Sequence, residues 1–354
     1  MEEKGLDFLI PFFVYNCLIL NMLLKDISFV IPVFNRPNEI DELLRSFSTQ
    51  KVTKDFEVVI VEDGSSNKCE NIINNYNNLN ISYYYKENTG PGDSRNFGMN
   101  KAKGSYFVIL DSDIILPENY CSILIYNLSN NFSECFGGVD DSHSSFNDFQ
   151  KAVSFSMTSL ITTGHVRGGS RTKNFQPRSF NMGISKEAFL KSGGFGKIHP
   201  GEDPDLSIRL QKAGFRTKLY ADLKVFHKRR VSIRSFFRQV YKFGIARSIL
   251  NHKFPETRKV IYWFPSIFSF VFLFSIILLF YKIDNLVFNI YLFYFLLVFI
   301  LSSIKNNIWV GFLSIMTTLI QFFGYGYGFI RSLILINIFP NKKIETIFPK
   351  MFFN

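Results

Sequence analysis

The sequence predicts an α/β fold with a mostly parallel sheet, followed by a helical membrane region. Between Asp26 and Leu223, short apolar runs rich in β-forming residues alternate with segments of helical periodicity. Such alternation indicates βαβ units. After residue 260 the chain contains long apolar and aromatic runs, which have the length that a bilayer-spanning helix requires.

The α/β segment divides into alternating elements in chain order. Strands are expected at Ile27–Val33, Glu57–Glu62, Ile81–Tyr85, Tyr106–Asp111 and, later, Lys218–Phe226. Helices are expected at Asn38–Thr49, Asn67–Tyr76 and Asp93–Ala102. In sheets of this kind, ligands bind beyond the carboxyl ends of the strands. The polar clusters of this sequence fall at those ends.

Three apolar runs indicate a membrane region. Ile261–Tyr281 and Val287–Ile304 contain no charged residue, which favours two spans over a buried soluble core. A third run begins at Ile308 and reaches Phe339. It contains Gln321, Arg331 and a glycine series (Gly324, Gly326, Gly328), and we expect one span plus an interfacial segment there.

A strongly basic segment, Lys224–Lys259, precedes the first span and holds eleven Lys or Arg residues and one acid. Basic residues beside a span favour the cytoplasmic face and attract anionic headgroups. A helical apolar stripe that begins at Ile233 predicts an amphipathic helix on the membrane. The adjoining spans explain the net charge of +11 better than a nucleic-acid partner does.

The apolar stretch Leu6–Leu24 fits a span, an interfacial anchor or a signal-like segment, and a translation start at Met22 is a further alternative. The four cysteines form no metal-binding pattern, which favours a reducing compartment. The predicted divisions are an apolar lead (1–25), the α/β domain (26–225), a basic interfacial region (226–259) and transmembrane helices (260–354).

Polar residues with a chemical pattern follow three of the strands. Asp111 and Asp113 follow a buried strand and can face one divalent cation, although a turn or helix cap would also use them. Asp63 precedes Gly64 and two serines and can accept hydrogen bonds from a base or ribose, although a plain turn is the alternative. The glycine-punctuated loop 88–98 enters a helix, whose free N–H groups and Arg95 suit a diphosphate.

Together, in this order, these motifs resemble family 2 glycosyltransferases of the GT-A fold, over about residues 26–245. The segments that carry the resemblance are Phe29–Arg36, Val61–Ser66, Asn88–Gly98, Leu110–Asp113, Asn181–Gly183, Gly193–Phe195 and Gly201–Leu206. Ser94 stands where the family usually has Ala. The nearest match to the QxxRW motif of processive polymerases, at Gln239, does not fit it, which favours transfer of a single sugar.

The resemblance implies an inverting, metal-dependent hexosyltransferase that uses a UDP- or GDP-type nucleotide sugar. It implies that Asp203 is the general base, with Glu202, Asp205 and Asn181 on the acceptor side and Asp205 as the alternative base. An acidic helix N-terminus is the structural alternative for this cluster. The donor-binding residues would be Pro32, Asn35, Arg36, Glu62, Asp63, Asn88, Gly90, Arg95, Asp111 and Ser112. Mn²⁺ or Mg²⁺ would bind Asp111, Asp113 and His227, unless His227 is a plain surface histidine.

The expected acceptor is a lipid-linked or glycan hydroxyl at the cytoplasmic face of the cell inner membrane, in polysaccharide or glycoconjugate synthesis. Two alternatives stay open: a polyprenyl-phosphate sugar synthase, and a non-catalytic membrane component of a polysaccharide assembly complex. The basic, glycine-rich loop Arg167–Arg171 either closes over a phosphate or is a plain surface loop.

Overall fold

The computed structural model describes residues 23–141, 143, 145–163, 175–228, 231–282 and 286–353. The predicted loop Arg167–Arg171 and the apolar lead up to residue 22 lie outside the described residues. The chain forms two compact units. The sheet unit comprises the described residues within Met1–Asp141, Ser170–Gly196 and Asp203–His227, and the helical unit comprises those within Ser142–Gly169, Lys197–Glu202 and Lys228–Asn354. The units interleave along the chain, so the linear domain limits stay a prediction.

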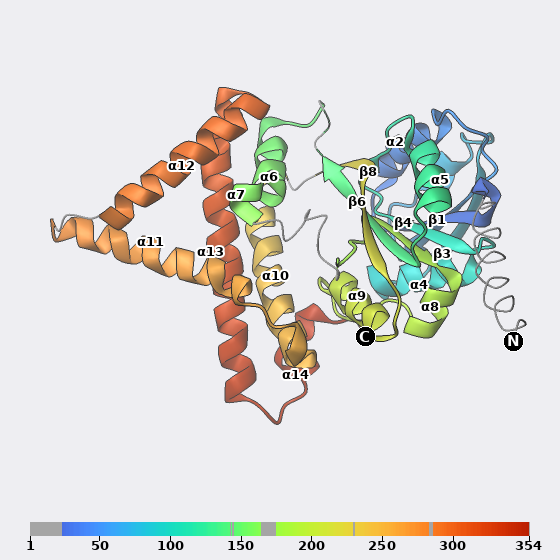
Figure 1. Cartoon of the computed structure of the whole chain (residues 1–354). Coiled ribbons are helices and arrows are strands. Elements are labelled where there is room, and N and C mark those ends of the chain that lie inside the picture. Colours follow the sequence, from blue (N-terminus) through green and yellow to red (C-terminus); the bar gives the residue numbers. More distant parts are fainter. Residues whose placement is uncertain are drawn as a thin grey trace, which may run out of the picture. The chain divides into compact units, whose positions relative to one another are not determined.

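The sheet unit contains one eight-stranded sheet with the order β3-β2-β1-β4-β7-β6-β8-β5 (Figure 1). The strands are β1 (Ile27–Val33), β2 (Glu57–Asp63), β3 (Asn80–Lys86), β4 (Tyr106–Leu110), β5 (Ile114–Ile115), β6 (Cys135–Asp141), β7 (Asn181–Ser185) and β8 (Thr217–His227). The four strands from β3 to β4 pair in parallel, and β7 pairs antiparallel with both of its neighbours. The mostly parallel α/β sheet expected from the sequence is therefore confirmed.

Helices pack on both faces of the sheet because successive strand residues point to opposite sides. Phe29 and Ile31 pack in one core with Leu43, Phe47 and further side chains of α2 (Pro37–Ser48) and α5 (Tyr120–Asn130). Val30 belongs to the second core, with residues of α4 (Pro91–Lys101), α8 (Lys186–Ser192) and α9 (Glu202–Lys212). Strands covered on both faces explain the nearly continuous apolar runs in the sequence.

One predicted helix is much shorter than expected. Asn67–Tyr76 contains only the single turn α3 (Glu70–Ile73). The asparagines that follow it disfavour helix, because their side chains compete for backbone hydrogen bonds. This segment lies before β3 and does not affect the order of the strands.

In the helical unit, glycines allow two helices to approach closely. α10 (Ile233–Lys253) packs along α13 (Ile308–Ile338), beside α6 (Asp148–Thr158), and the unit also contains α7 (Leu160–Thr163) and α14 (Ile344–Ile347). A Cβ added at Gly328 would lie 2.2 Å from the carbonyl oxygen of Tyr241, and one added at Gly244 would lie 2.2 Å from that of Tyr325. Small residues at such positions let helix backbones pack against each other.

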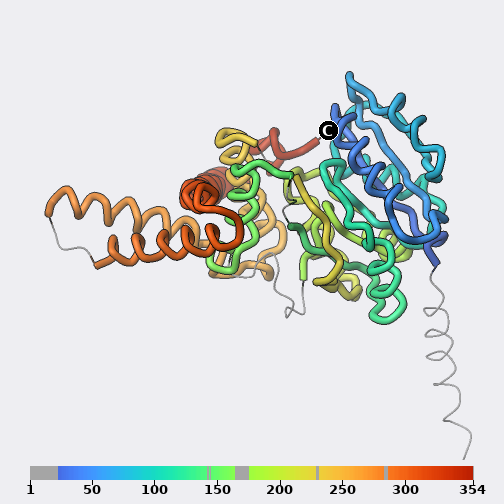
Figure 2. Tube along the Cα trace, turned by 90° about the horizontal axis from the view of Figure 1, so that it is seen from above, coloured from blue at the N-terminus to red at the C-terminus, as the bar shows by residue number. Residues whose placement is uncertain are grey.

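Three helices are long and apolar enough to cross a membrane: Val260–Phe280, Leu286–Lys305 and Ile308–Ile338. The helix α11 (Phe264–Phe280) and the helix α12 (Leu286–Lys305) form a V that extends away from α13, which Figure 2 shows nearly end-on. α13 runs unbroken through its glycines for 31 residues. At about 46 Å, it is longer than a hydrocarbon core of about 30 Å. The run in which we expected a span and an interfacial segment is thus one continuous helix.

We predict that Gly328→Ala separates α10 from α13 and destabilises the protein. The added methyl group meets the backbone of Tyr241, which cannot move aside as a flexible side chain would. Overpacking of this kind costs about 1–3 kcal/mol. Thermal unfolding in detergent should show a lower Tm, whereas Ile334→Ala, at an exposed position of the same helix, should change it little. Equal Tm values for both variants would contradict the close helix packing.

Candidate active site

The parallel strands bring polar groups together at one edge of the sheet. Asn35 and Arg36 follow β1, Asp63 and Lys86 end β2 and β3, and Asp111–Asp113 follow β4. These four strands are neighbours that run in the same direction. Their carboxyl ends therefore form one edge, which is where open α/β sheets bind ligands.

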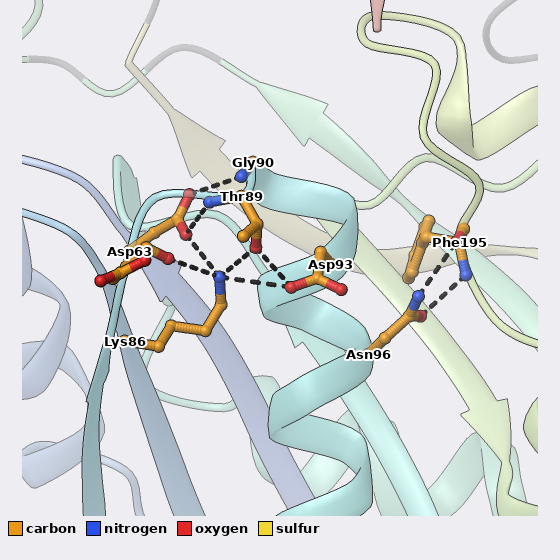
Figure 3. A network of polar contacts seen from close by, with 8 residues as sticks. Asp63, Lys86, Thr89, Gly90, Asp93, Asn96 and Phe195 are labelled. Carbon is orange, nitrogen blue, oxygen red and sulfur yellow. Dashed lines mark hydrogen bonds and ion pairs between the residues drawn. The ribbon is translucent and has the colours of Figure 1, made fainter. Parts of the chain in front are cut away.

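Asp63 organises the loop that leads into α4 (Figure 3). Its carboxylate accepts hydrogen bonds from the backbone N–H groups of Thr89 and Gly90, each at 3.0 Å, and from Lys86 Nζ at 2.7 Å. Lys86 also contacts Thr89 Oγ1 and lies 3.3 Å from Asp93. The carboxylate is buried and is already used by the protein. Its predicted contact with a base or ribose stays a prediction.

Glycines are required where this loop passes the turn after β2. Gly64 has a φ of +74°, and a Cβ there would lie 2.7 Å from the backbone nitrogen of Asn88. Gly90 has a φ of +95° at the N-cap of α4, and Pro91 begins the helix. The exposed Asn88 thus lies where the loop backbone passes close to Gly64, shortly before the N-terminus of α4. A helix N-terminus suits an anion.

The sequence assigned no role to Lys86, and it gave Asn96 none of its own although Asn96 lies in the Asn88–Gly98 motif. The Asn96 side chain accepts a hydrogen bond from the Phe195 N–H at 2.8 Å and donates one to the Phe195 carbonyl at 2.9 Å (Figure 3). It thereby ties α4 to the glycine turn that follows α8. Lys86 did not stand out, because a lone lysine at a strand end has no distinctive spacing, and the motif that contains Asn96 does not reveal its contact with Phe195.

A group of two acids and one imidazole lies beyond β4. These residues are Asp111, Asp113 and His227. Each offers one ligand atom, and the three atoms lie within 4.8 Å of one another. His227 Nε2 is 3.2 Å from Asp113 Oδ1, and its ring stacks on Phe180. Carboxylate oxygens with one imidazole form a donor set that suits Mn²⁺ or Mg²⁺. The residues that the sequence assigned to a metal therefore fit one.

Two arginines balance these acids. Arg95 Nη2 lies 2.7 Å from Asp111 Oδ1 and its side chain is buried, while Arg36 forms an ion pair with Asp113. Burial alone would raise the pKa of the Asp113 carboxyl, but His227 and Arg36 lower the pKa well below its ordinary range. Asp113 is therefore ionised at neutral pH, as a metal ligand must be.

One further acid near this group was missed. Asp140 Oδ2, on β6, is 3.9 Å from His227 Nδ1. This distance is an ion-pair contact beyond hydrogen-bond range, so Asp140 adds negative charge beside the ring. The signal was available in the acidic pair Asp140–Asp141, which closes β6 next to β8.

Several predicted donor-side residues lie inside the protein. Pro32 is buried in β1, and Ser112 is also buried. Glu62 is fully buried, and its carboxylate accepts from the Cys69 N–H at 2.9 Å and from the Tyr83 hydroxyl at 3.3 Å. This geometry favours a structural role for Glu62. Asn35 is exposed, and its side-chain oxygen accepts from the backbone N–H of Asn67, which joins the turns after β1 and β2.

The acceptor-side residues differ in their surroundings. Asn181 is fully buried in β7, where it accepts from the Tyr120 hydroxyl at 2.7 Å and donates to the Leu223 carbonyl at 3.0 Å. Asp205 is also fully buried and pairs with Arg209 Nε at 2.9 Å. Asp203 is only partly buried on the first turn of α9. The structure thus favours Asp203 over Asp205 as an acid that a substrate can reach.

The model of the family described as "Glycosyl transferase family 2" matches residues 28–193, which contain the strand edge and the Asp111–Asp113 pair. Residues 28–193 are a family 2 glycosyltransferase domain. Together with the observed sheet order, this match confirms the GT-A glycosyltransferase fold expected from the sequence.

Known glycosyltransferases are similar to parts of this chain. An uncharacterized glycosyltransferase of Rickettsia typhi is 40% identical over 93 residues, which cover 26% of this chain and 29% of that protein. Chondroitin synthase of Escherichia coli is 28% identical over 241 residues, which cover 58% of this chain and 35% of the synthase. This chain therefore spans only about a third of the length of these relatives.

Two solved structures are also similar at low sequence identity. A mannosyltransferase from Pyrobaculum calidifontis, in complex with GDP-Man and Mn²⁺, has a TM-score of 0.49 and 15% identity, covering 68% of this chain and 71% of that chain. TarS 1–349 from S. aureus, in complex with UDP-GlcNAc, has a TM-score of 0.46 and 20% identity, covering 64% of this chain and 67% of that chain.

We predict that Asp205→Asn mainly lowers stability. Without the carboxylate, Arg209 keeps its contacts to the carbonyls of Ser192 and Gly194 but loses its charge partner. Removing one member of a buried ion pair costs about 3–5 kcal/mol. A lower Tm with nucleotide binding retained at low temperature is the expected result. An unchanged Tm would show that Asp205 is not a structural acid.

Proposed function

We propose that this protein is an inverting glycosyltransferase that moves one sugar from a UDP- or GDP-type donor to a lipid-linked or glycan acceptor. The observation that carries the proposal is the group Asp111, Asp113 and His227 at the strand edge of a family 2 glycosyltransferase domain. Arg36 and Arg95 flank this group, and a helix N-terminus follows the loop held by Asp63.

The donor diphosphate is expected to bind at this edge. Asp111, Asp113 and His227 would hold Mn²⁺ or Mg²⁺, which supplies positive charge to the leaving diphosphate. Arg36 and Arg95 neutralise the two carboxylates in the absence of the donor. With a cation in that role, their guanidinium groups become available to the diphosphate oxygens.

In the transfer step, the acceptor hydroxyl oxygen attacks the anomeric carbon from the face opposite the diphosphate. The new C–O bond forms as the bond to the diphosphate oxygen breaks, so the configuration inverts. Asp203 takes the hydroxyl proton, which a general base must do as the oxygen loses electron density. Its partly buried position on the first turn of α9 supports this role.

The apolar helices support an acceptor carried by a membrane lipid. α11, α12 and α13 are each long and apolar enough to cross a bilayer, and basic residues cluster before the first of them. Under the rule that basic flanks face the cytoplasm, the sheet unit would work at the cytoplasmic face of the inner membrane. Anchoring raises the effective concentration of a lipid-borne acceptor.

We predict that Asp203→Asn abolishes sugar transfer while nucleotide binding is retained. The amide keeps the shape of the side chain but takes up no proton. Transfer should be measured with UDP-N-acetylglucosamine and GDP-mannose, against polyprenyl phosphate and polyprenyl-diphosphate-linked glycan in separate arms. Calorimetry with UDP and GDP reports donor binding. Full transfer by folded Asp203→Asn protein would refute the base assignment, and a product on polyprenyl phosphate would identify a polyprenyl-phosphate sugar synthase instead.

We predict that chelation stops transfer and that added Mn²⁺ or Mg²⁺ restores it. Asp113→Asn should weaken Mn²⁺ binding by roughly 10-fold or more in calorimetry, in line with the usual cost of disturbing a metal site. Asp55→Asn, at an exposed position before β2, is the matched control and should bind Mn²⁺ normally. Transfer that persists after thorough chelation would contradict the metal role of this group.

A further inference from the structure

The short loop Lys197–Glu202 belongs to the helical unit, although the residues on either side of it belong to the sheet unit. It ends at Glu202, the first residue of α9, and Asp203 follows directly in the chain. The loop therefore carries Glu202, one of the acids expected on the acceptor side, and leads directly into Asp203.

A segment more than 140 residues away in the sequence holds the loop through its backbone. Ile198 forms a β-bridge with Phe352. The His199 N–H donates to the Met351 carbonyl at 2.8 Å, and the Phe353 N–H donates to the Lys197 carbonyl at 3.2 Å. These bonds continue across three successive loop residues. The 344–353 segment thus pairs with the loop in the manner of a short antiparallel strand.

Apolar side chains support the same pairing. Ile198, Phe348 and Met351 are 6%, 5% and 3% exposed and share one core cluster. The cluster also contains Ile245, Ala246 and Ile249 of α10 and Ile336 of α13. Because these helices are long and packed together, they give the loop a rigid base.

Contacts within the loop connect Glu202 to the residues that pair with the 344–353 segment. One carboxylate oxygen of Glu202 lies 2.9 Å from His199 Nδ1, and the other accepts from the Gly201 N–H at 2.9 Å. The Glu202 side chain is 6% exposed. His199 bonds to Met351 through its backbone and to Glu202 through its ring. A displacement of Met351 would therefore move Glu202.

We propose that the 344–353 segment is a positioning element for Glu202, with Phe348 and Met351 as its positioning residues. It fixes the loop that carries Glu202, the acid expected on the acceptor side. This inference rests on the proposed function, with Glu202 beside the acceptor. Misplacing a catalytic group by about 1 Å can cost roughly 10²-fold in rate.

The decisive variant is Met351→Asp, which puts a charge into the apolar cluster and loosens the loop. Thr346→Asp is the matched control, since it adds the same charge at an exposed position of the same segment. Met351→Leu keeps an apolar side chain of similar size and should rescue function. Phe348→Ala, a milder change, covers the case in which Met351→Asp does not fold.

Three measurements separate the outcomes: hydrogen exchange of residues 197–203, UDP and GDP binding with Mn²⁺, and transfer to phosphatidylglycerol vesicles that contain polyprenyl-diphosphate-linked glycan. In Met351→Asp or Phe348→Ala we expect faster exchange in the loop, unchanged nucleotide affinity and kcat lowered by roughly 10²-fold for Met351→Asp. Wild-type exchange and kcat in the folded variants would overturn the proposal. A wild-type protein that transfers no sugar would instead count against the proposed function.

Discussion

The parallel alignment of β3, β2, β1 and β4 is the constraint on which the candidate site depends. Because these strands run in one direction, their ends deliver a lysine, three acids and an arginine to the same edge of the sheet. Ion pairs at this edge, such as Lys86–Asp63 and Arg95–Asp111, keep the charges balanced where one or both side chains are buried. A buried charge without such a partner would be costly, so the site is assembled as a balanced set.

The sequence predicted β1, β2 and β4 well, because strands that are buried on both faces consist of nearly continuous apolar runs. It also grouped Asp111, Asp113 and His227 as metal ligands, and the structure brings these three side chains together although His227 is 114 residues from Asp113. It could not separate residues that support the frame from residues that a ligand can reach. Glu62 and Asn181 lie within motifs of the family, yet their polar atoms bond to buried neighbours. Burial is a tertiary property that spacing does not reveal.

The choice between Asp203 and Asp205 shows the same limit. Both acids lie on the first turn of one helix, and the sequence ranked them only by resemblance. The structure separates them because Asp205 faces the core and pairs with Arg209, whereas Asp203 keeps partial exposure. In the helical unit, the glycines of α13 suggested an interruption from sequence alone. Gly324 and Gly328 instead lie against α10, and Gly326 lies against the start of α11, since a missing Cβ serves close packing as well as flexibility.

The loop Lys197–Glu202 has a consequence for modularity. The match to the family model ends at residue 193, before this loop, while the residues that hold the loop lie on α10, α13 and the segment beyond. Exchange of residues 28–193 between related enzymes, by recombination or by design, would therefore leave both this loop and His227 on β8 with the original host.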